Sequence, residues 1–193
     1  MPHKNMNRYI IIVLAAISIL GTALVYFQEP LSTTAANYYI QDGNKLLAME
    51  RYEEALTSFN IALKQQTSSS GALLGRALVF INQEKYNIAE KELTLLIELL
   101  TIASTPDSNE KTNILSSAFA NRGIIKDRKG TYKAAFDDYV TALKTKAGIT
   151  NLDKVLSENS MPSTLRERAI YLKKQIELPP GMRTLIVPKV QNN

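Results

Sequence analysis

Residues 118–143, AFANRGIIKDRKGTYKAAFDDYVTAL, predict two short helices that pack against each other. Residues of one face recur at spacings of three and four, first as Phe119, Arg122 and Gly123, and later as Tyr132, Ala135, Tyr139 and Ala142. Gly130 and Thr131 interrupt this pattern. Because Gly123 and Ala135 are small, the two backbones can approach closely. The stretch therefore predicts a helical hairpin.

At these residues the chain resembles the tetratricopeptide repeat (TPR), a helix pair that stacks into solenoids. In an earlier copy at residues 36–67, Ala55 follows Gly43 by twelve positions, the same interval by which Ala135 follows Gly123. Asp42 stands there in place of the Leu that the family usually has before this glycine. The resemblance therefore extends to a first repeat at 36–67 and a third at 116–147.

A weaker second repeat is predicted at 70–100, where Ala77 replaces the glycine. Ala89 follows Ala55 by 34 residues, which is the family period, whereas Ala135 follows Ala89 by 46. The twelve extra residues are predicted as an insertion at 101–112, TIASTPDSNEKT, which is rich in turn formers. This insertion is interpreted as a surface loop or, alternatively, as a partner contact.

Capping helices are expected at 148–178, after Gly148 as a helix C-cap. The segment Ser163 to Glu177 predicts a helix with Thr164 as its N-cap, and its apolar face would cover the end of the third repeat. An extended tail follows at 179–193, and it either docks on a neighbour or on the solenoid, or is disordered. The resemblance implies an all-α fold, a right-handed α-solenoid of three TPR helix pairs plus a C-terminal capping helix.

One transmembrane helix is predicted before this domain, at residues 9–27. Ile10 to Phe27 contains 18 residues without a charge, and at a rise of about 1.5 Å per residue it approaches the thickness of a bilayer core. A cleaved signal peptide and a buried core helix are the alternatives. Lys4 and Arg8 lie in the short stub 1–8, and no Lys or Arg occurs from Gln28 to Asp42. The positive-inside rule then predicts a cytoplasmic N-terminus, a linker at 28–35 and an extracytoplasmic, for example periplasmic, TPR domain.

Composition excludes most catalytic chemistry. The chain has no Cys, and its one histidine, His3, lies in the predicted stub, so that neither a Ser-His-Asp triad nor a histidine or cysteine metal site is expected. Asp137 and Asp138 are interpreted as solvated carboxylates on a helix surface. The chain has a net charge of +5 from dispersed basic residues without interleaved aromatics, which argues against nucleic acid binding. We predict no enzyme activity, no cofactor and no metal.

What remains is a binding surface. In TPR proteins the inner faces of the first helices of each pair form a groove, and the resemblance maps it to Asn37, Ile40, Asn44, Leu47, Leu74, Leu78, Ile81, Asn82, Ala120, Asn121, Ile124 and Asp127. The lysine and arginine set with which chaperone-binding TPRs hold a terminal carboxylate is missing there. The chain's own tail or capping helix could instead fill the groove.

These features predict a membrane-anchored scaffold for protein–protein interaction, an accessory or assembly subunit of a membrane complex whose groove takes a peptide or a helix. A structural subunit locked into a permanent membrane assembly and a secreted soluble adapter are the alternatives.

Overall fold

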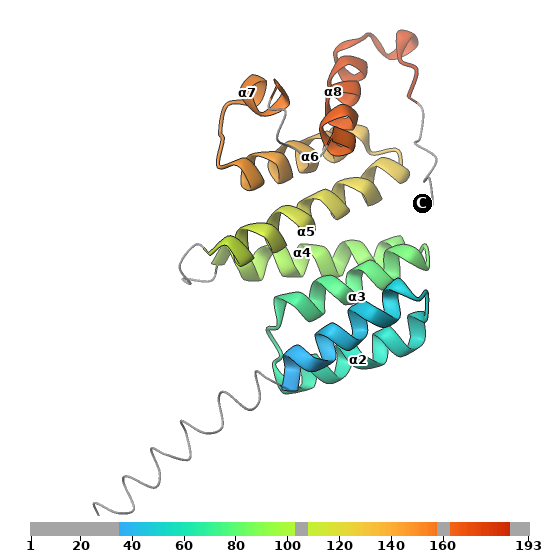
Figure 1. The fold of residues 1–193 in the computed structure, drawn as a ribbon. Helices are drawn as coiled ribbons and strands as arrows, with labels where there is room; N and C mark the ends of the chain where they lie inside the picture. The colour runs from blue at the N-terminus through green and yellow to red at the C-terminus, as the bar shows by residue number, and fades with distance from the viewer. Residues whose placement is uncertain (1–34, 103–107, 158–162, 186–193) are drawn as a thin grey trace, which may run out of the picture.

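The computed structural model describes residues 35–102, 108–157 and 163–185, and within these ranges all regular structure is helical and no strand occurs. A first helix covers 35–48, and the others are α2 (Tyr52–Gln65), α3 (Ser70–Asn82), α4 (Tyr86–Ile102), α5 (Asn109–Arg128), α6 (Tyr132–Ala147), α7 (Leu152–Ser157), α8 (Ser163–Glu177) and a 3-10 turn at Pro180–Met182. The helices stack in chain order, with α8 on the last pair (Figure 1). The predicted all-α class is confirmed.

The three helical hairpins share one turn. Glu50, Glu84 and Gly130 stand at equivalent positions, and each has a positive φ, of 58°, 58° and 75°. The backbone N–H of the next residue then donates to a carbonyl five residues earlier, as from Thr131 to Lys126 at 2.9 Å. The left-handed conformation is easy for glycine but costs a glutamate about 1 kcal/mol. The common turn sets how each pair of helices packs.

Small residues lie where the two helices of a pair cross. A Cβ built on Gly43 would lie 2.7 Å from the Phe59 ring, and one built on Gly123 would lie 2.7 Å from the Tyr139 ring. Phe59 also fills the space above Gly75 of the next repeat, where a Cβ would lie 2.3 Å away. These distances are too short for any side chain, and glycine is therefore required at these contacts.

The region predicted as an insertion is partly helical. α5 begins at Asn109, because the Ser108 side chain accepts a hydrogen bond from the Lys111 N–H at 3.0 Å and Glu110 occupies the first turn. Residues 109–112, which we predicted as part of a loop, thus lengthen the first helix of the third repeat. Residues 103–107 lie outside the described residues.

The cap packs on the last helix pair. Gly148 ends α6 with a φ of 65°, as predicted, and Asn151 Oδ1 accepts from the Lys154 N–H at the start of α7. Ala169 and Leu172 of α8 are buried against the core that contains Tyr139. Thr164 is not the N-cap as predicted, because α8 already includes Ser163.

The first described part of the tail stays close to the cap. The Thr184 N–H donates to Gln175 Oε1 at 2.7 Å, and the Tyr171 hydroxyl donates to the Thr184 carbonyl. Leu185 packs against the same core as α8. Up to Leu185, the tail therefore docks on the chain itself.

The predicted transmembrane segment, Ile10 to Phe27, lies outside the described residues, as do the stub 1–8 and most of the linker. Among the helices that the structure describes, none combines the length and the apolar character that crossing a membrane requires.

Candidate functional site

We call the twelve residues predicted to form the groove the A-helix face, since they belong to the first helix of each pair. In the helix 35–48, Asn37 and Asn44 are exposed, whereas Ile40 and Leu47 are half-buried against the core around Phe59. The amides therefore face solvent while the aliphatic side chains support the helix packing. At this end of the face, exposed amide groups therefore lie beside half-buried aliphatic side chains.

The middle of the A-helix face lies on α3. Leu74 and Leu78 are half-buried and Asn82 is exposed, with its Nδ2 donating to the Leu78 carbonyl at 2.9 Å. Ile81 is only 9% exposed, because it packs into the core formed with α4 and α5. Ile81 thus supports the core. Although we predicted it as a groove residue, it is not available to a partner.

The last third of the face, on α5, joins the capping helix in a pocket of about 730 Å³. Ala120, Ile124 and Asp127 line its α5 side, and Leu165, Arg168 and Tyr171 line its α8 side. Asn121 is half-buried on the same helix, and its Nδ2 donates to the Ser117 carbonyl at 2.8 Å. The capping helix therefore forms one wall of the pocket without filling it.

Asp127 lines the pocket but is almost completely buried, although we predicted it as an accessible groove residue. Its side chain is 1% exposed, and both of its oxygens accept from Arg168, each at 2.7 Å. The Tyr139 hydroxyl donates to Asp127 Oδ2 at 3.2 Å. Burial, together with the charge of Asp127 and this hydrogen bond, raises the pKa of Tyr139. Asp127 fastens α8 to the third repeat.

Both arginines beside the pocket are engaged by other groups. Arg168 pairs with Asp127 and lies 4.8 Å from the centre of the Tyr171 ring. Arg128 Nη1 donates to the Tyr86 hydroxyl at 2.7 Å, and its guanidinium lies 5.3 Å from the Tyr86 ring centre. An acidic ligand would have to compete with these contacts.

A polar bridge that we did not predict from the sequence recurs between the two helices of every repeat. The bridges join residues sixteen apart, as Asp42 to Ser58, Arg76 to Glu92 and Arg122 to Asp138. Their first members follow each other by 34 and 46 residues, as the alanines at the crossings do. This shared spacing is the feature of the sequence from which the bridges could have been predicted.

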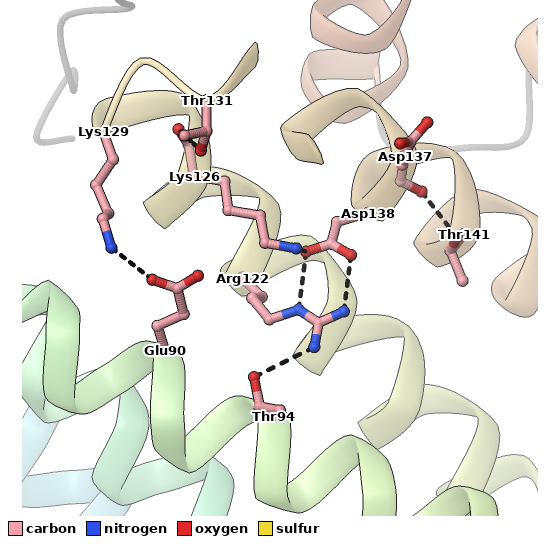
Figure 2. A network of polar contacts seen from close by, with 9 residues as sticks. All are labelled: Glu90, Thr94, Arg122, Lys126, Lys129, Thr131, Asp137, Asp138 and Thr141. Carbon is pink, nitrogen blue, oxygen red and sulfur yellow. Dashed lines mark hydrogen bonds and ion pairs between the residues drawn. The ribbon is translucent and has the colours of Figure 1, made fainter. Parts of the chain in front are cut away.

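The third bridge, shown in Figure 2, includes contacts to Lys126 and to Thr94 of the second repeat. Arg122 holds Asp138 with two hydrogen bonds of 2.8 and 2.9 Å, Lys126 adds an ion pair of 2.8 Å, and Arg122 Nη1 also donates to Thr94 of the second repeat at 3.2 Å. Asp138 is buried, so that its interpretation as a solvated carboxylate was wrong. Asp137 is exposed, as expected. The sequence could not distinguish these neighbours without knowing which side of the helix faces α5.

Comparison with known proteins bears on the fold. No family model and no curated protein matches the sequence. Solved structures do match, and two TPR domains are among them. The chain is 18% identical to the Arabidopsis OM64 TPR domain, with a TM-score of 0.56 over 74% of this chain and 98% of that one. It is 17% identical to the first TPR of Spaghetti (RPAP3) bound to the HSP90 peptide SRMEEVD, with a TM-score of 0.53 over 73% of this chain and 95% of that one. The chain has the fold of a TPR domain.

Within the described residues, no three His, Asp or Glu side chains gather in a way that could hold a metal ion. The A-helix face and its pocket carry the functional hypothesis.

Proposed function

We propose that this TPR domain is a non-catalytic scaffold that binds an apolar peptide segment of another protein along its A-helix face. The observation that carries the proposal is the pocket between α5 and α8, which continues the face defined by Ala120 and Ile124. A peptide-bound TPR structure has the same overall fold, which supports a peptide as the kind of ligand.

The chemistry of the face favours an apolar segment over an acidic tail. Its twelve positions contain no Lys or Arg, and the two arginines beside the pocket already hold Asp127 and Tyr86. The exposed amides of Asn37, Asn44 and Asn82 can hydrogen-bond a peptide backbone, which is independent of the peptide's charge. We therefore expect apolar side chains in the pocket and backbone contacts along the first two repeats.

Selection from a phage library of random twelve-residue peptides tests the proposal. We expect apolar peptides with micromolar affinity, and we expect SRMEEVD, used as an acidic control peptide, to bind at least about 10-fold more weakly. Ala120→Arg places a long side chain at the pocket wall and should weaken the selected peptides at least about 10-fold. Thr57→Arg, on the exposed surface of α2, should not. Failure to select any peptide, or equal binding by Ala120→Arg, contradicts the proposal.

We further propose that residues 9–27 anchor the domain in a membrane, with the N-terminus in the cytoplasm and the TPR domain on the other side, as an accessory or assembly subunit of a membrane complex. The uncharged run supports a membrane span, and the Lys4 and Arg8 that precede it support this orientation. Alkaline extraction of membranes should leave the full chain in the pellet. Recovery in the supernatant would favour a secreted adapter.

A further inference from the structure

α4 has an apolar stripe on its exposed side that the A-helix face does not include. Ile88, Leu95, Leu99 and Ile102 are 45, 46, 38 and 80% exposed. They stand seven, four and three residues apart, so that they lie on one side of the helix over four turns. Helices usually turn such a side toward a partner.

The TPR fold does not require this stripe. The residues equivalent to Leu99 in the other two repeats are Gln65 of α2, 34 residues earlier, and Thr145 of α6, 46 residues later. Relative to Ile102 the equivalents are Ser68 and Gly148. Only the second of the three repeats is apolar at both positions, so the stripe is a property of α4.

We propose that the stripe binds α4 of a second copy of this chain in antiparallel orientation, with Leu95 on the two-fold axis. In this arrangement the numbers of two residues that face each other, one from each copy, add up to about 190. Ile88 then faces Ile102 of the second copy, and Leu95 faces Leu95. The apolar stripe is thus complementary to itself, as a two-fold interface requires.

The charges beside the stripe favour the same pairing. Lys91 and Glu98 are exposed and lie on one flank of the stripe. Within the described ranges neither has an ion-pair partner at contact distance, although the charge of Glu98 also acts on Arg122. Antiparallel pairing brings Lys91 of each copy beside Glu98 of the other, which forms two intermolecular ion pairs. Parallel pairing would place equal charges at equal heights and would form neither pair.

The proposed interface consists of one helix from each copy and lies at the small end of specific interfaces. We therefore expect a reversible dimer with a dissociation constant on the order of 10 µM. Such a dimer would present two A-helix faces to one partner assembly.

Light scattering after gel filtration of the full chain in mild detergent tests the dimer. Leu95→Glu should make the chain monomeric by placing two carboxylates on the axis, whereas Thr141→Glu, the equivalent change in α6, should leave the dimer intact. Lys91→Glu should weaken the dimer at least about 10-fold, and adding Glu98→Lys should restore it. A monomeric wild type at about 200 µM, or a dimer that survives Leu95→Glu, overturns the proposal.

Disulfide cross-linking tests the orientation, because the native chain has no Cys. Leu95→Cys should cross-link to itself. Ile88→Cys should cross-link to Ile102→Cys when the two variants are mixed, and not to itself. Cross-linking of Ile88→Cys to itself alone would show parallel pairing and overturn the antiparallel interface.

Discussion

Phe59 and Tyr139 occupy the same position in the first and third repeats, but they close their repeats differently. Phe59 is fully buried between Gly43 and Gly75 and belongs to the apolar core of the first repeat. Tyr139 packs on Gly123 in the same way and adds a hydroxyl that donates to Asp127. Since Asp127 also holds Arg168 of α8, the hydroxyl connects the crossing of the last repeat to the cap.

The difference shows how a repeat protein can end its stack. In the first repeat the next helix pair is available, and the ring of Phe59 fills the space at Gly75 of that pair. After the third repeat, α7 and α8 follow as a cap, and the same position contacts the ion pair of Asp127 with Arg168, which holds α8. Four substitutions test this comparison.

The largest effect is expected from Phe59→Ala. Removing a ring that is fully buried between two repeats leaves a cavity and should cost about 4 kcal/mol of the free energy of unfolding. Chemical denaturation followed by circular dichroism measures the loss. A loss under about 1 kcal/mol would show that the first crossing does not depend on this ring.

Asp127→Asn should come next, at about 3 kcal/mol, because it leaves the half-buried Arg168 guanidinium without its anion. Hydrogen exchange should show the loss of protection first in α8 and only weakly in α2. Equal loss of protection in both helices would contradict a separate role of Asp127 in holding the cap.

Phe59→Tyr gives the first crossing the tyrosine hydroxyl of the third. It should cost about 2 kcal/mol of the free energy of unfolding, since it buries a hydroxyl in an apolar site. Thermal melting compares it with the wild type. An unchanged melting temperature would mean that the first crossing already offers the hydroxyl a partner.

The smallest effect is expected from Tyr139→Phe, about 1 kcal/mol for one buried hydrogen bond.

Tyr139→Phe should also change the pH dependence of stability. A free tyrosine loses its proton near pH 10, whereas burial, then the charge of Asp127, raises the pKa of Tyr139 in the folded chain. The unfolded chain therefore releases this proton first, and stability falls above about pH 10. Denaturation at pH 8 and pH 11 should show a smaller loss of stability for Tyr139→Phe than for the wild type. An equal loss in both proteins would exclude Tyr139 as a cause of the pH dependence.

The sequence predicted the fold through short-range information. Gly43, Gly123 and Ala135 marked the helix crossings, and the 34-residue period placed the repeats, because each repeat contacts mainly its neighbours. The same local rules explain the C-cap at Gly148. They failed at Asn109 to Thr112, where the Ser108 cap extends a helix into residues that resemble a loop.

Only the tertiary structure decided which polar groups are accessible. Asp127 and Asp138 look like surface carboxylates in the sequence, but Arg168 and Arg122 neutralise them at the helix contacts. The pocket between α5 and α8 likewise depends on where the cap comes to rest, and the exposure of the α4 stripe depends on which of its sides α3 and α5 cover. The spacing of residues along one helix determines its periodicity, whereas burial and charge pairing depend on the neighbours that packing brings to it.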